Sequence, residues 1–185
     1  MAVSTALACD NDVRAFIDEY FEAWSGTDED RILSHYSETV SVEIPGAIIN
    51  GKAALRDQFV RPFVAGFPGN RHLVKNMIFG KDFVVVEWSF EAAHKGPFVG
   101  TAATGAAVKL PGCGVYQFDP LKRQITTAHI YFDVTTLLKQ ISSHQPQVLQ
   151  NLLISWFAAR DYPKSGSGSA YARSDGRREG STKVE

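Results

Sequence analysis

One stretch of alternating sequence places a histidine and a carboxylate where they could move protons. In TTAHIYFD, residues 126–133, successive side chains of an extended strand face opposite sides, so His129, Tyr131 and Asp133 share a face with Thr127. An imidazole changes its charge near neutral pH and can take up and release a proton. The pair His129 and Asp133 therefore indicates general acid/base chemistry.

Each member of this pair also has a purely structural interpretation. Asp133 stands directly before VTTLLKQI, where an aspartate can cap a helix by accepting a backbone N–H two or three residues further on. His129 can lie on the outer or dimer-facing side of a sheet instead of in a pocket.

A second histidine, His94, ends the stretch VVVEWSFEAAH and opens the loop HKGPFVGTAATG. It shares strand parity with Trp88 and Phe90, the apolar side that should face inward. We expect His94 either at the mouth of a pocket or hydrogen-bonded to the loop backbone, whose shape it would then determine. The other histidines considered, His35 and His72, read as an ordinary helix end and strand start.

Aromatic side chains could line a cavity and bind an apolar substrate, and tyrosine hydroxyls could donate to a substrate carbonyl. The alternative for most of them is core packing. The candidate substrate-binding residues are Tyr20, Trp24, Tyr36, Trp88, Phe98, Tyr116, Tyr131 and Phe132.

Several function classes lack their signals. The histidines do not have the H-x-x-x-H or H-E-x-x-H spacing of metal sites, and no G-x-S-x-G nucleophile turn occurs. The glycines of residues 94–105 lie between two strands, away from the helix start that a phosphate site needs. With 19 basic and 20 acidic residues the chain has no basic face for nucleic acid. We expect no metal, no cofactor, no membrane span and a cytoplasmic location.

The elements that position these residues change from helical to strand-like along the chain. Apolar spacing predicts helices within 10–24, 27–36 and 51–67, the last with a kink or early end near Arg61 because Pro62 lies inside it. TVSVEI at 39–44 reads as a strand that stops at Pro45. Period-2 alternation then predicts four long strands with short links, which favours a mostly antiparallel sheet and an α+β fold.

The termini have a different composition from this central part. We expect a flexible N-terminus over 1–10, one domain over 11–145, an extra amphipathic helix over 146–162 and a disordered Gly/Ser-rich tail over 163–185.

Three stretches in order make the chain resemble the SnoaL-like polyketide cyclase and ester cyclase family of the nuclear-transport-factor-2-like superfamily. They are YFEAWSGTDEDRILSHYSETV, the H-x-G-x-F-x-G-x-x-x-T-G pattern that begins at His94, and QITTAHIYFDVTTLLKQI. The resemblance covers roughly Val13 to Ser142. It implies a cone-shaped fold in which N-terminal helices pack on a strongly curved sheet and enclose an apolar pocket.

The resemblance also implies a function. Polyketide cyclases of this family use one aspartate, helped by a histidine, as general acid/base without metal or cofactor, and Asp133 is the carboxylate that matches their pattern. The implied activity is a cyclase or isomerase acting on a hydrophobic polyketide- or terpenoid-like molecule, with Asp133, His94 and His129 as proton carriers. A small epoxide hydrolase or dehydratase is the second possibility.

A non-catalytic ligand-binding or dimerisation module is the third possibility. The chain has Ile130 and Gly114 where many family members carry a carboxylate and a polar residue, and this departure favours the third possibility. An inward-pointing ionisable side chain in the cavity would separate the enzyme interpretations from the binding module. We also expect a homodimer through the outer face of the sheet, which should carry Val85 and Val115.

Overall fold

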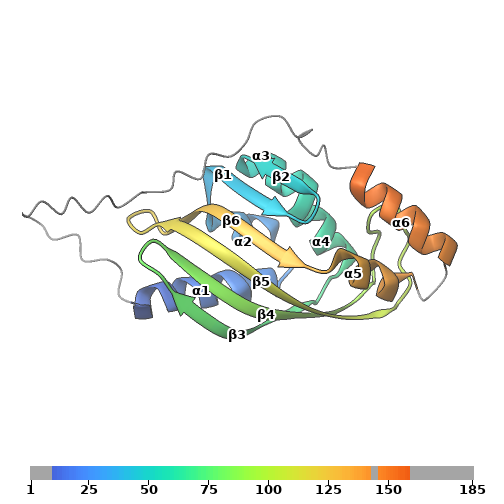
Figure 1. Ribbon diagram of the computed structural model, residues 1–185, viewed down its shortest axis with the longest axis horizontal. Coiled ribbons are helices and arrows are strands. Elements are labelled where there is room, and N and C mark those ends of the chain that lie inside the picture. Colours follow the sequence, from blue (N-terminus) through green and yellow to red (C-terminus); the bar gives the residue numbers. More distant parts are fainter. Residues whose placement is uncertain (1–9, 143–145, 159–185) are drawn as a thin grey trace, which may run out of the picture.

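The computed structural model describes residues 10–142 and 146–158, and these form helices packed on one six-stranded sheet (Figure 1). The elements, in chain order, are α1 (Asp10–Trp24), α2 (Glu29–Ser34), β1 (Tyr36–Ile44), β2 (Ala47–Asn50), α3 (Lys52–Leu55), η1 (Arg56–Val60), α4 (Arg61–Gly66), β3 (Arg71–Phe79), β4 (Phe83–Ala93), β5 (Ala107–Asp119), β6 (Gln124–Phe132), α5 (Val134–Ile141) and α6 (Pro146–Ala158). This confirms the α+β class.

The strands lie in the order β2-β1-β6-β5-β4-β3. All neighbouring pairs are antiparallel except β1 and β6, which run parallel. The prediction of four long, mostly antiparallel strands is therefore confirmed. β2 was not predicted: four residues after the turn at Pro45 and Gly46 are too short for a pattern to show, and they pair back onto β1.

Of the kink or early end predicted near Arg61, the structure has no end there but an irregular turn directly before Arg61. The chain stays helical from α3 through η1 to α4, and η1 is a π-helical turn that comes just before Pro62. A proline lacks the N–H for the helical hydrogen bond and its ring crowds the preceding turn. A wider turn at this point accommodates the ring without interrupting the helix.

The helices of the first half cover one face of the sheet, while α5 and α6 lie at one end of it (Figure 1). In α6, Leu152 and Trp156 are fully buried, and the Trp156 indole donates to the backbone oxygen of Pro45 at 3.1 Å. The predicted extra helix is thus packed on its own domain. The predicted flexible N-terminus lies outside the described residues except for Asp10, which begins α1, and the predicted tail lies outside them entirely.

Candidate active site

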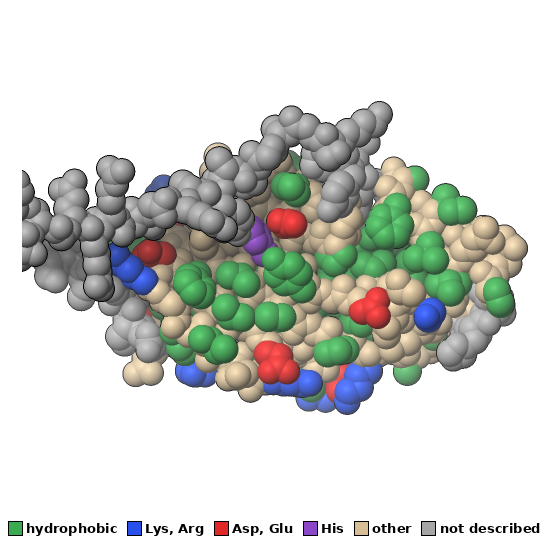
Figure 2. Space-filling view, viewed as in Figure 1, with side chains coloured by type: hydrophobic (Ala, Val, Ile, Leu, Met, Phe, Trp, Pro, Cys, Tyr) green, Lys and Arg blue, Asp and Glu red, His purple; other side chains and the backbone are tan. Residues whose placement is uncertain are grey.

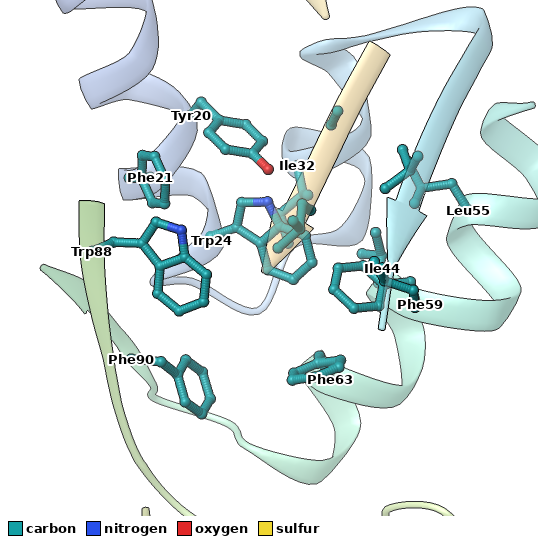
Figure 3. Packing of buried hydrophobic residues seen from close by; sticks show 14 of the residues in the cluster. Tyr20, Phe21, Trp24, Ile32, Ile44, Leu55, Phe59, Phe63, Trp88 and Phe90 are labelled. Carbon is teal, nitrogen blue, oxygen red and sulfur yellow. The ribbon is translucent and has the colours of Figure 1, made fainter. Parts of the chain in front are cut away.

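The helices and the inner face of the sheet form an apolar cavity that is partly open, and Figure 3 shows how several of its lining side chains pack. Its volume is about 40 Å³, which is room for about three water molecules. The lining is almost entirely aromatic or aliphatic and contains no carboxylate. The residues that line it are Tyr20, Phe21, Trp24, Phe59, Phe63, His72, Trp88, Phe90, Leu110, Tyr116, Ile130 and Phe132.

Tyrosine hydroxyls are the main polar groups at this cavity. The hydroxyl oxygens of Tyr20 on α1 and Tyr36 on β1 lie 2.6 Å apart, and the Tyr116 ring centroid is 5.5 Å from that of Tyr20. Burial raises the pKa of all three, that of Tyr36 to about 12. The three hydroxyls therefore keep their protons at neutral pH and can donate them in hydrogen bonds.

The structure explains why Gly114 and Ile130 differ from the residues that the family resemblance implied. The two residues are cross-strand partners, and both face inward with Val86. A Cβ built on Gly114 would collide with the hydroxyl and ring of Tyr116, which lies across the glycine. The position where the resemblance implied a polar side chain is thus occupied by a hydroxyl that comes from two residues further along the strand.

His72 is the functional candidate that the sequence did not single out. It lines the cavity from β3, and its pKa falls from 6.5 to about 3 because burial disfavours the charged imidazolium, which a hydrogen bond with the Trp24 backbone only partly offsets. Asn70 orients the ring. The Asn70 amide nitrogen donates to the Phe67 carbonyl at 3.2 Å, so its oxygen faces His72 Nδ1 at 3.1 Å. Nδ1 therefore carries the proton, and Nε2 keeps its lone pair.

A β-bulge explains why pattern reading failed at His72. β3 and β4 pair with His72 opposite Phe90 and Val74 opposite Trp88, and the register then shifts between Val74 and Asn76. The shift moves inward-facing residues from even to odd numbers within one strand. Alternation along β3 is consequently too weak to show which face His72 takes, although its inward-facing partner Phe90 was recognised.

Asp133 does not line the cavity. It is the N-cap of α5, and its carboxylate accepts from the Thr136 hydroxyl at 2.6 Å and from the Thr136 backbone N–H at 3.1 Å. These hydrogen bonds lower its pKa, with the Thr136 hydroxyl making the largest contribution. An exposed carboxylate with a lowered pKa has the opposite of the environment that a buried acid/base aspartate needs.

His94 is buried, yet it too lies outside the cavity lining. Its Nδ1 is 3.0 Å from the Thr104 hydroxyl, and its backbone N–H and carbonyl bond to Ala106 and Gly105. Burial lowers its pKa. The contacts agree with the alternative in which His94 determines the shape of the loop.

His129 and Tyr131 lie on the outer face of the sheet, opposite the cavity. The His129 side chain is 40% exposed and its Nε2 is 4.0 Å from the Glu43 carboxylate, while Tyr131 is 53% exposed. The shared face predicted for them is confirmed, but it is the outer one. The structure therefore does not bring His94, His129 and Asp133 together.

Apart from Tyr131, which lies on the outer face, the predicted aromatic set divides into two groups. Tyr20, Trp24, Trp88, Tyr116 and Phe132 line the cavity. Tyr36 and Phe98 are buried just behind the lining: Tyr36 contacts Tyr20, and Phe98 packs against Phe63.

Replacement of Gly114 by alanine tests the steric arrangement of the cavity wall. Because the added methyl group collides with Tyr116, we expect Gly114→Ala to lower the free energy of unfolding by about 1–3 kcal/mol. In a Tyr116→Ala background the same change should cost much less. Urea denaturation of the four proteins of this double-mutant cycle measures the difference; equal costs in both backgrounds would contradict the arrangement.

The buried His72 makes stability depend on pH. Its folded pKa of about 3 lies below its ordinary value of 6.5, so the unfolded chain binds the proton more tightly and stability is lost as the pH falls from 6.5 toward 3. We expect His72 to account for a loss of about 2 kcal/mol between about pH 7.5 and pH 5. Urea denaturation should show a flatter pH profile for His72→Gln. Lys81→Gln, at an exposed position between β3 and β4, is the control and should keep the wild-type profile.

Two further observations limit what the described residues can do. Within 10–142 and 146–158, no three histidine, cysteine or acidic side chains are grouped so that they could hold a metal ion. None of the helices described there is long and apolar enough to cross a membrane.

Comparison with known proteins places this geometry in a family. The SnoaL-like domain matches residues 17–125, whereas no curated protein sequence matches. Among solved structures, the chain is similar to a candidate SnoaL-like polyketide cyclase from Jannaschia sp. CCS1 (19% identity, 70% of this chain and 91% of that one, TM-score 0.62). It is also similar to AclR, a candidate hydroxylase from Streptomyces galilaeus (20%, 80% and 94%, 0.63).

A third similar structure is SalBIII, an epoxide hydrolase/cyclase-like enzyme with a role in pyran ring formation in the polyether salinomycin (17% identity, 69% of this chain and 95% of that one, TM-score 0.59). Identities this low indicate a shared fold. Because the domain match spans more than half of the sequence and the fold agrees with it, the chain belongs to the SnoaL-like domain family.

Proposed function

We propose that this protein is a cofactor-free general acid/base enzyme of the cyclase or isomerase type, acting on a hydrophobic polyketide- or terpenoid-like small molecule. The observation that carries the proposal is the cavity: an aromatic enclosure whose lining includes a neutral histidine and tyrosine hydroxyls. In this proposal His72 is the proton carrier, in place of Asp133, His94 and His129.

His72 has the properties of a proton acceptor in an apolar site. Asn70 holds the proton on Nδ1, which leaves the Nε2 lone pair to take a proton from the carbon next to a substrate carbonyl. Burial alone disfavours the imidazolium that results. The enolate formed in the same step carries the compensating negative charge. In an isomerisation the proton returns to carbon; in a ring closure the enolate carbon attacks a second carbonyl and the proton passes to the alkoxide oxygen that this creates.

The tyrosine hydroxyls supply the second requirement, which is stabilisation of the enolate oxygen. Tyr20 and Tyr116 line the cavity and stay protonated because burial raises their pKa. Fixed donors in a site without water stabilise a developing oxyanion more strongly than water does. Tyr36 supports them through its contact with Tyr20.

The size of the cavity places a condition on the substrate. The cavity has room for about three water molecules, which is less than a polycyclic molecule or even cyclohexanone needs. Either molecule enters only if lining side chains move, and the candidates for this movement are the phenylalanines Phe59, Phe63 and Phe132. Family membership supports a small-molecule pocket at this place.

The other two functions have less support. Epoxide hydrolysis or dehydration through a carboxylate-held water would need Asp133 near Tyr20, and Asp133 caps α5 outside the cavity lining. A purely ligand-binding module was expected to have a cavity without inward ionisable groups, whereas His72 faces this one.

Exchange of α-hydrogens tests proton abstraction without knowledge of the natural substrate. In deuterated buffer, we expect the protein to speed deuterium incorporation next to the carbonyl of cyclohexanone by about 10²-fold or more, followed by NMR. His72→Gln should lose the acceleration, since it removes the proton acceptor. Asp133→Asn, which can still cap α5, should keep it.

The variants also separate the alternatives. Loss of exchange in Asp133→Asn, with the thermal unfolding unchanged, would make Asp133 the proton carrier. Binding of ketones without exchange in the wild-type protein would favour the non-catalytic module.

We also propose that the protein forms a homodimer through the outer face of the sheet. Ile78, Val85, Val115 and His129 lie side by side across four strands on this face. Figure 2 shows the apolar side chains gathered over β3 to β6. Ile78 and Tyr131 are more than half exposed in the single chain, and a second copy would cover them.

Substitution on this face tests the dimer. Val115→Glu places a charge at the centre of the apolar row, so we expect the mass in solution, measured by light scattering, to fall from twice 20.3 kDa to 20.3 kDa. Leu121→Glu is the control, because Leu121 is 81% exposed in the turn between β5 and β6. A wild-type protein that is already monomeric would contradict the proposal.

A further inference from the structure

Two indole N–H groups in the cavity wall have no acceptor in the protein. Trp24 on α1 and Trp88 on β4 are each 5% exposed, and neither Nε1 has a hydrogen-bond partner among the described residues. An indole nitrogen can only donate. A buried donor left unpaired costs about 1–3 kcal/mol, so these two groups are destabilising unless something else accepts from them.

The N–H groups of both indoles are directed toward tyrosine side chains. The Trp24 nitrogen and the Tyr20 hydroxyl point toward one another (Figure 3), and donation from the Trp24 N–H toward the phenol oxygens acts to lower the pKa of Tyr20 and Tyr36. Trp88 acts on the pKa of Tyr116 in the same direction. Neither indole nitrogen reaches a tyrosine oxygen with the distance and angle of a full hydrogen bond.

A glycine positions Trp88. Its six-membered ring lies across Gly112, its cross-strand partner, where any Cβ would collide with it. Gly112 and Gly114 thus make two successive inward positions of β5 empty of side chain, and Trp88 and Tyr116 occupy them. The sequence of β5 brings an indole N–H and a phenol O–H to the same stretch of cavity wall.

The hydrogen-bond donors on the cavity wall determine which chemical class of ligand can bind there. Tyr20, Tyr116, Trp24 and Trp88, which we call the donor cluster, line the cavity and each carry a hydrogen that can be donated when Tyr36 donates to Tyr20, and none is charged at neutral pH. A neutral carbonyl oxygen of a ketone or ester accepts such hydrogens. A carboxylate would lose its hydration with no cation to balance it, and an ammonium group would add further donors.

We propose that Trp24 and Trp88 are ligand-binding residues whose indole N–H groups hold a neutral carbonyl oxygen within the donor cluster. This inference rests on the proposed function in that it takes the cavity to be the ligand site, and it adds the chemical class of the ligand. The carbonyl end of the ligand lies against the tyrosines, and its apolar remainder lies among the phenylalanines.

NMR of the full-length protein labelled with ¹⁵N-tryptophan tests the proposal directly. The chain has three tryptophans, so three indole N–H signals are available. Trp156 is the internal control, because its indole already donates to Pro45. On addition of cyclohexanone, we expect the Trp24 and Trp88 protons to move downfield as they gain an acceptor, and the Trp156 proton to stay.

A matched pair of probes distinguishes the contribution of the carbonyl oxygen to binding from that of the hydrocarbon ring. Methylenecyclohexane has the shape of cyclohexanone without the acceptor, and two new hydrogen bonds should make the ketone bind about tenfold more tightly. Trp24→Phe and Trp88→Phe should each reduce this preference while methylenecyclohexane still binds.

The remaining outcomes overturn the proposal in different ways. Equal binding of the two probes, or ketone binding that leaves both indole signals in place, excludes the indoles as ligand donors but leaves the proposed function standing. Preferred binding of cyclohexylammonium would make the aromatic wall a cation site. Failure of every probe to bind would remove the proposed function as well.

Discussion

The contact between Tyr20 and Tyr36 is the interaction on which the rest of this structure depends. It joins the first helix to the first strand through two buried hydroxyls 2.6 Å apart, and it places Tyr20 edge-on against the rings of Trp24 and Tyr116. A buried hydroxyl must find a partner. Because these partners come from α1, β1 and β5, satisfying them fixes how the helix lies across the sheet and where the cavity remains.

The same contact explains the electrostatic character of the cavity. Its polar groups are neutral because burial moves their pKa values away from 7 in the direction that removes charge: upward for the tyrosines and downward for His72. The carboxylates Asp133 and Glu43 are instead exposed, where hydrogen bonds or water stabilise the ion. Proton transfer inside the cavity must therefore create its charges in pairs, as a histidine and an enolate do.

Empty positions are as important here as side chains. Gly112 and Gly114 leave the space that Trp88 and Tyr116 fill, and at the second position the Tyr116 hydroxyl stands where the resemblance implied a polar residue. The departure from the family pattern was interpreted as a loss of chemistry. In the folded protein the position is polar after all, because a neighbouring hydroxyl occupies the space that a side chain at 114 would need.

The sequence by itself determined the local features. Period-3.6 and period-2 spacing predicted the helices and the four long strands, and strand parity correctly separated Ile130 and Phe132 from His129 and Tyr131. Asp133 before a helical stretch was recognisable as a cap. These features depend on residues close in sequence, whose geometry the backbone imposes.

Only the tertiary structure decided which set of alternating strand residues faces inward and which side chains contact one another across the cavity. Pairing with Phe90 put His72 on the inner face ahead of the bulge in β3, and cross-strand pairing laid Trp88 over Gly112. Pairing on β6 put His129 beside Glu43 on the outside. The physical reason is that strand register and side-chain collisions join residues far apart in the chain, so the candidate site was specified by contacts that no local pattern records.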